Sequence, residues 1–340
     1  MRHSITIFSV LVLAAPAYAQ DPLTFSFGGT VAGGWLDLES ISSSGDGYGY
    51  DAPVLQLEGR FSADYAVSED LSAGLIGRIS AREGTQARYD AINISFGPQP
   101  GRFDKFEIDL ATYLSAGPLV LSYGDMESSF SLATLEVDAG NSPIPAGGAV
   151  HMNIGGGLGT EGIPLSDTSA LDPRFYTSRT TRADLAYGDF LLSISTSLNE
   201  RGRAKSVGLK WDRDFGEFGV TVGLGYEQGP SRDYRSASAA LEYQGFRFVV
   251  NEIRQVASFD YNLVYRGYSA SYDFGQLDLG IAKARQAPKG FFSVFEGDAK
   301  AFWVGWEFDE SSRVDFEMSE GDYQSGNDVK SMSLAYSYQF

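Results

Sequence analysis

The chain has 340 residues, with 40 glycines, 23 phenylalanines, 19 tyrosines and a formal net charge of −18. The absence of cysteine excludes disulfides and thiol chemistry, and the acidity argues against nucleic-acid binding. We therefore expect a fold held by backbone pairing, with surfaces that attract cations.

The first segment, Met1–Ala19, has the features of a secretory signal peptide. Arg2 gives it a basic start, Ile5–Ala15 is a short apolar run, and Ala17–Ala19 is a small-x-small cleavage site. The apolar run is too short to cross a bilayer as a helix, and no longer one follows. We expect cleavage after this segment and export through the periplasm. Residues 20–340 should form one domain, and membrane insertion would require a closed β-barrel.

Alternating apolar and polar runs, which are typical of β-strands, fill the rest of the chain. Tight turns rich in Gly and Asp join pairs of these runs. The turns lie at Ser68–Asp70, Gly117–Pro118, Tyr187–Phe190, Phe215–Phe218, Tyr243–Phe246, Asp273–Gln276 and Asp309–Ser311. With Leu23–Leu38 at the start and Val329–Phe340 at the end, these seven turns predict sixteen strands.

Eight longer and more polar segments separate the predicted hairpins. They are Glu39–Pro53, Glu83–Phe103, Met126–Tyr176, Glu200–Arg203, Gln228–Asp233, Gln255–Asp260, Gln286–Asp298 and Glu320–Asp328. An even number of strands, with short turns at one rim and long loops at the other, is the pattern of a transmembrane β-barrel. Asp90–Phe96 could form a strand of its own, and we assign it to a loop to keep the number even.

Aromatic residues gather beside the tight turns, as they do at membrane–water boundaries. They are Tyr65, Tyr187, Phe190, Phe218, Tyr243, Phe246, Phe308, Tyr338 and Phe340. The alternative is a soluble β-sandwich, whose strands also alternate. A sandwich would bury its aromatic face and has no reason to place rings beside turns. We therefore predict an all-β, closed antiparallel transmembrane barrel.

The last strand alternates strictly, with Tyr336, Tyr338 and Phe340 on one face and small polar residues on the other. Together with the leader and the long third loop, Met126–Tyr176, this ending resembles the Gram-negative general porins, particularly the sixteen-stranded alphaproteobacterial type. The resemblance implies a homotrimer in the lipids of the cell outer membrane, a third loop folded into the lumen, and passive passage of small hydrophilic solutes. It also implies that the C-terminal strand is the assembly signal read by the barrel-assembly machinery.

Alternate residues of each strand face lipid and lumen in turn. The set that carries the charges should line the lumen, because a basic side chain facing lipid at mid-depth costs roughly 2–4 kcal/mol. This assignment predicts a basic wall formed by Arg60, Arg78 and Arg82. A turn centred on Glu69 places Arg60 directly opposite Arg78, an unfavourable juxtaposition that nearby Glu58 could offset. The alternative is that these arginines are solvated and have no special role.

The third predicted loop has 51 residues, far more than an ordinary connection. We expect its first part, around Glu127 to Gly140, to enter the lumen. Glu127, Glu136 and Asp138 would then form an acidic constriction facing the basic wall, with a mild preference for cations. In the alternative, the loop lies on the rim.

Catalysis and metal binding have little support in the sequence. His151 is the only histidine after the leader, so we expect neither a His-rich metal site nor an enzyme. No cofactor is expected, although loop carboxylates such as Asp46 and Asp51 could hold structural calcium. The alternatives to a general diffusion channel are a channel specific for a sugar or organic acid, a secreted adhesin, and an outer-membrane hydrolase using His151. A lumen ladder of aromatics would favour the specific channel, and Trp303 and Tyr113 are the only inward candidates.

Overall fold

The computed structural model describes residues 23–41, 47–88, 99–102, 105–135, 137, 179–199, 202–229, 232–257, 262–289, 296–323 and 327–340. The predicted signal peptide, Asp90–Phe96 and His151 lie outside these ranges, and the predictions made for them stay predictions. No helix in this part of the chain is long and apolar enough to cross a bilayer.

The described residues are almost entirely β-strand. The first strands are β1 (Leu23–Ile41), β2 (Gly47–Ser68), β3 (Leu71–Arg88), β4 (Gln99–Arg102), β5 (Lys105–Ala116), β6 (Leu119–Asp125), β7 (Arg179–Tyr187), β8 (Phe190–Asn199) and β9 (Gly202–Asp214). The remaining strands are β10 (Phe218–Gln228), β11 (Arg232–Tyr243), β12 (Phe246–Ala257), β13 (Asn262–Asp273), β14 (Leu277–Lys289), β15 (Gly297–Glu307), β16 (Ser312–Tyr323) and β17 (Asn327–Gln339). One short helix, α2 (Ser129–Ala133), follows β6.

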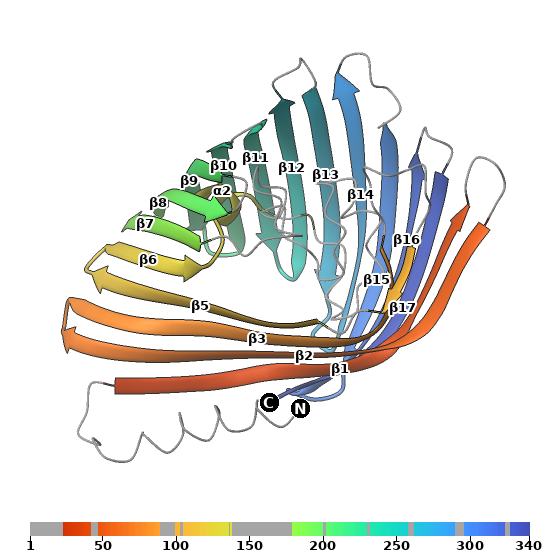
Figure 1. Ribbon diagram of the computed structural model, residues 1–340, viewed down its shortest axis with the longest axis horizontal. Coiled ribbons are helices and arrows are strands. Elements are labelled where there is room, and N and C mark those ends of the chain that lie inside the picture. The colour runs from red at the N-terminus through yellow and green to blue at the C-terminus, as the bar shows by residue number, and fades with distance from the viewer. Residues whose placement is uncertain are drawn as a thin grey trace.

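Sixteen of these strands close into an antiparallel barrel. Each wall strand pairs with its sequence neighbours, and β1 also pairs with β17, which closes the sheet. The exception is β4, which has four residues and extends the end of β3 as a small ribbon, while β3 itself pairs onward with β5. Figure 1 shows the sheet curving round so that β17 returns to β1, with α2 on its inner side near β8, β9 and β10. The prediction of sixteen wall strands is confirmed.

All seven predicted tight turns join the expected hairpins, but several strand ends differ from the prediction. The strands β1 and β2 run to Ile41 and from Gly47, so most of the predicted first loop is wrong and Asp51 lies in a strand. Likewise β3 extends to Arg88. Backbone pairing continues past the apolar part of these strands, because a solvated extension of a hairpin needs no apolar face.

The alternate apolar side chains of each strand point outward. Leu57, exposed at 38%, and Leu334, exposed at 53%, lie on the outside, whereas a dry sandwich would bury them together. On β17 the alternate residues Ser331 and Ser333 face inward and are buried. Rings also stack across neighbouring strands at the tight-turn rim, as Phe218 does on Tyr243 with 4.5 Å between centroids. An apolar outer wall with an aromatic rim is the arrangement of a barrel in lipid.

Candidate functional site

The segment after β6 enters the barrel because Gly124 allows the chain to pass close to a neighbouring strand. Gly124 has a φ of +148°, and a Cβ there would collide with the carbonyl of Leu110 on β5. Just beyond it, the hydroxyl of Thr180 on β7 donates to the carbonyl of Met126 at 3.0 Å. The loop is therefore directed along the inside of the wall, as the sequence predicted.

The helix α2 is the first element of this inner segment. Its N-cap is Ser128, whose hydroxyl accepts a hydrogen bond from the N–H of Ser131 at 3.4 Å. At the other end, the hydroxyl of Thr134 donates to the carbonyl of Phe130 at 2.7 Å. So short a helix is unstable by itself. Packing holds it instead: Phe130 is completely buried and its ring lies 6.1 Å from that of Tyr234 on β11.

Three glycines of the wall form a flat seat for α2. A Cβ on Gly208 of β9 would collide with the carbonyl of Ser129, and one on Gly223 of β10 with the carbonyl of Ala133. On Gly225, a Cβ would lie 2.9 Å from the ring of Phe130. Only the lack of side chains at these positions lets the loop backbone lie directly against the sheet.

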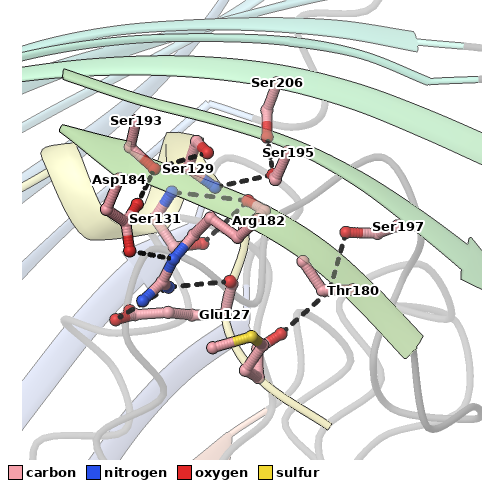
Figure 2. A network of polar contacts seen from close by, with 12 residues as sticks. Glu127, Ser129, Ser131, Thr180, Arg182, Asp184, Ser193, Ser195, Ser197 and Ser206 are labelled. Atoms are coloured by element: carbon pink, nitrogen blue, oxygen red, sulfur yellow. Dashed lines mark hydrogen bonds and ion pairs between the residues drawn. The ribbon is translucent and has the colours of Figure 1, made fainter. Parts of the chain in front are cut away.

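A buried network of hydroxyls and charges holds the loop to β7, β8 and β9 (Figure 2). The hydroxyl of Ser193 donates to Asp184 at 2.5 Å and lies 2.7 Å from that of Ser129. Because the Ser193 proton is used by Asp184, the Ser129 hydroxyl donates to Ser193. The N–H of Ser129 donates to Ser195 at 2.9 Å. Loop and wall thus satisfy each other's buried polar groups.

A second set of contacts fixes the end of α2 to β11 and β12. The hydroxyls of Thr134 and Ser236 lie 2.6 Å apart. The N–H of Leu135 donates to the hydroxyl of Ser238 at 2.9 Å, and the side-chain amide of Asn251 donates to the Leu135 carbonyl at 3.0 Å. The inner segment therefore crosses the face of six consecutive strands, β7 to β12.

The first predicted constriction acid, Glu127, pairs with Arg182 on β7. Their charged atoms are 3.7 Å apart, and Arg182 also donates to the Glu127 carbonyl at 3.1 Å and to Asp184 at 2.9 Å. The Glu127 side chain keeps 45% exposure, but the surrounding protein removes much of its water. This desolvation raises the pKa of Glu127, while the Arg182 charge opposes the shift. Glu136 and Asp138 lie outside the described residues.

The predicted basic wall lies on the same face of the sheet as the loop seat. Arg60 is directly opposite Arg78, and Arg78 is opposite Asp109 of β5. Tyr113, four residues after Asp109 on β5, lies opposite Ser122 of β6, and Ser122 lies opposite Arg182 of β7. Positions directly opposite in a sheet share a face, so the arginines project into the lumen. The ion-pair distances are 2.9 Å from Arg60 to Glu58 and 3.9 Å from Arg78 to Asp109.

The third predicted wall residue, Arg82, has the same parity as Arg78 and lies opposite Gln56 in the register. Its side chain is not among those that the structure describes. Its backbone therefore has the predicted inward register, and the role of its charge stays a prediction.

An acidic cavity of about 680 Å³ opens at the tight-turn end of the lumen. Its lining carries seven carboxylates and three arginines, an excess of four negative charges. One of these arginines, Arg313, contacts three carboxylates at once: Asp278 at 2.5 Å, Asp315 at 2.6 Å and Glu307 at 3.1 Å. The mouth is thus a mixed but predominantly negative vestibule.

Inward aromatic residues are more numerous than the two predicted from the sequence. Besides Trp303 and Tyr113, Tyr234 and Tyr265 face inward and are buried, so the expectation of only two was wrong. Trp303 lies against Gly280 and Tyr113 against Gly74, each across the register of neighbouring strands. Tyr234 packs against Phe130 of the loop, and the hydroxyl of Tyr265 donates to Gln255. Among the described side chains these rings form no open ladder along the lumen.

Sequence reasoning missed the loop seat. The residues that form it are small or polar and share the inward parity of β8 to β11: Ser193, Ser195, Ser197, Ser206, Gly208, Gly223, Gly225, Ser236 and Ser238. An uninterrupted patch of Ser and Gly at lumen positions was the available signal, because a wall facing only water has no need of such small side chains.

The chain is similar in fold to solved structures of a bacterial porin and of another outer membrane protein. One is a variant of the Rh. blastica porin, with a TM-score of 0.58 and 14% identity over 93% of this chain and 100% of that chain. Another is a loop-deletion mutant of OmpT, an outer membrane protein of Vibrio cholerae, with a TM-score of 0.57 and 11% identity over 94% of this chain and 100% of that chain. No protein-family model and no curated protein sequence matches. At these identities the comparison establishes a porin-type fold.

Proposed function

We propose that this protein is an outer-membrane porin, a passive diffusion channel for small hydrophilic solutes and ions. The observation that carries the proposal is a closed sixteen-stranded wall with an apolar outside, a charged inside and a loop fastened across part of its lumen. A barrel of this size is too wide for its own side chains to fill, so water occupies the centre. The loop narrows this water-filled path without closing it.

A mild preference for cations is the second part of the proposal. The vestibule at the tight-turn end has four more carboxylates than arginines, and a charged entrance concentrates ions of the opposite sign. On the other wall, Arg60 and Arg78 are each beside a carboxylate, so they impose a local transverse field and little net positive charge. Solutes that carry a dipole would be oriented as they pass between Arg78 and the loop.

No chemical step belongs to this function. We propose export through the periplasm, a homotrimer surrounded by outer-membrane lipids, and insertion by the barrel-assembly machinery through the strand that ends in Phe340. These proposals rest on the apolar exterior and on the exposed rings Tyr336, Tyr338 and Phe340 at the closing strand.

Recording in planar bilayers under a salt gradient tests the channel directly. We expect stepwise ohmic currents and a reversal potential whose sign indicates cation preference. Folded protein that gives no current would overturn the channel. Anion selectivity would overturn the role of the vestibule but leave the channel intact. Membrane fractionation with heat-modifiable gel mobility separates this proposal from a secreted soluble β-protein.

A further inference from the structure

Lys210 on β9 differs from the other basic side chains of the inner wall because it has no counter-charge beside it. Each of the others has a carboxylate within ion-pair distance: Arg60, Arg78, Arg182, Arg247 and Arg313. Among the described residues, no ion pair of 4.0 Å or less involves Lys210. A charge that no neighbour neutralises acts most strongly on the solutes that pass it.

Lys210 lies at the edge of the three-glycine seat of α2. It is the next inward residue after Gly208, on which the carbonyl of Ser129 rests, and it lies directly opposite Gly223, on which the carbonyl of Ala133 rests. The loop backbone therefore passes beside Lys210. The side chain is half-buried, so its aliphatic stem packs against the wall while its ammonium group stays in the water of the lumen.

Glu127, at the start of the inner segment, supplies a carboxylate near the same edge. Its contact with Arg182 is long, at 3.7 Å, because Arg182 lies closer to Asp184, at 2.9 Å (Figure 2). The Glu127 side chain is 45% exposed and still faces the lumen. The charge of Lys210 acts on Glu127, but the two side chains form no ion pair. A negative and a positive group therefore share the same water without neutralising each other.

We propose that Glu127 and Lys210 together bind a zwitterionic solute, one that carries both an ammonium and a carboxylate group. The ammonium of the solute donates to Glu127, and its carboxylate accepts from Lys210, so each end gains a charge-assisted hydrogen bond. Once one end is bound, the second contact forms within the same complex, at a high effective concentration. A solute with a single charge gains only one contact. This inference rests on the proposed function, because it places the solute in the lumen of a channel.

Ligand-observed NMR titration of the detergent-folded barrel measures this binding without requiring a current. The probes are two zwitterions of different length, glycine and 4-aminobutyrate, and two solutes of single charge, butyrate and butylammonium. We expect at least one zwitterion to bind more tightly than both singly charged solutes. Lys210→Gln and Glu127→Gln should each weaken its binding about two- to fivefold, which is the range of exposed charge pairs. Lys210→Arg should retain binding, because it keeps the charge.

The matched control is Lys205→Gln on the same strand. Lys205 is exposed on the outer face, opposite Thr196 and Gln228, so its loss should leave binding unchanged. Equal losses in Lys205→Gln and Lys210→Gln would overturn the site. A wild type that conducts but binds neither zwitterion more tightly than butyrate and butylammonium would overturn the site alone. A wild type that binds a zwitterion as expected but carries no current would contradict the channel and leave the site standing.

Discussion

Arg60 on β2 and Arg78 on β3 face each other directly across one hairpin, and each lies beside a carboxylate of its own, Glu58 and Asp109. Arg78→Ala should therefore leave the barrel folded, because it relieves one like-charge contact while breaking one weak ion pair. It removes one positive charge from beside Asp109 in the lumen. We expect the cation-to-anion permeability ratio to rise by a factor of about 1.4 to 5, as exposed charges interact by about 0.2–1 kcal/mol. Reversal potentials under a salt gradient measure this ratio.

The control for Arg78 is Arg254→Ala on the outer face. Arg254 also pairs with a carboxylate, Glu252, but it points away from the lumen. Its replacement should leave currents and reversal potentials unchanged. If Arg78→Ala gave the same reversal potential as wild type, the basic wall would have no part in selectivity.

Adding a side chain to one of the three glycines that seat α2 should widen the channel. In Gly223→Ala, the new Cβ would collide with the Ala133 carbonyl and lie 2.8 Å from the hydroxyl of Ser238. Overpacking of this kind costs about 1–3 kcal/mol, which the loop avoids by lifting from the wall. We expect a larger and noisier single-channel conductance with no loss of the folded barrel.

Gly219→Ala is the matched control on the same strand and the same inward face. Its Cβ would meet Glu242 at 3.5 Å, an ordinary contact. The two glycines differ in what lies above them, so only Gly223→Ala should change the current. Identical conductance in both variants would show that the described loop does not set the width of the path.

As the pH is lowered, the cation preference should begin to fall at a higher pH than the titration of ordinary glutamates would give. Desolvation raises the pKa of Glu127, so this group gains its proton before solvated acids do as pH falls. Titrating the reversal potential should show a step above the ordinary glutamate range that Glu127→Gln removes. A step that survives this substitution would assign the titration to another group.

The same shift has a consequence for stability with the opposite sign to the usual acid case. The pKa of Glu127 is raised in the folded protein, so folding favours its protonated form. Its stabilising contribution to the free energy of unfolding is therefore fully present below the ordinary glutamate pKa and is lost as pH rises through its pKa in the folded protein. Denaturant unfolding at several pH values measures this effect. Between the ordinary glutamate pKa and the raised one, the free energy of unfolding should depend less on pH in Glu127→Gln than in the wild type.

The wall of this barrel was predictable because hairpin geometry is local. Turn residues fix the register, so placing the turn at Glu69 was enough to put Arg60 opposite Arg78. Strand ends at the long-loop rim were less predictable: β2 begins at Gly47, well before its apolar stretch. Backbone pairing alone extends such a ribbon, and pairing leaves no mark in the apolar pattern.

The position of the third loop on the inner wall was not predictable from local patterns. Its entry into the lumen was expected, but the contact of Glu127 with Arg182 brings together residues 55 positions apart. The alternation of side chains along β7 predicts that Arg182 and Asp184 face the lumen, but it does not indicate that they hold the loop. The patch of Ser and Gly on β8 to β11 has meaning only after the closed wall places it opposite a segment with buried polar groups to satisfy.

Phe340 closes the barrel on Gly29, which predicts a specific role for the last ring. The two residues exchange backbone hydrogen bonds of 2.9 and 3.0 Å, and the ring of Phe340 lies 5.9 Å from that of Phe27. Phe340→Ala keeps the backbone bonds and loses a ring contact of about 0.5–1.5 kcal/mol. We expect slower acquisition of the heat-modifiable folded form, followed by wild-type conductance once folded.

Phe274→Ala supplies the comparison, since Phe274 is an exposed turn ring packed edge-on against Tyr272 at 4.4 Å. It removes an equivalent aromatic contact at the same rim but away from the β1–β17 seam. If closure at the seam limits folding, Phe340→Ala slows assembly and Phe274→Ala does not. Equal slowing would mean that rim aromatics act only through their contact with the membrane boundary. The C-terminal ring would then have no role beyond that of its neighbours.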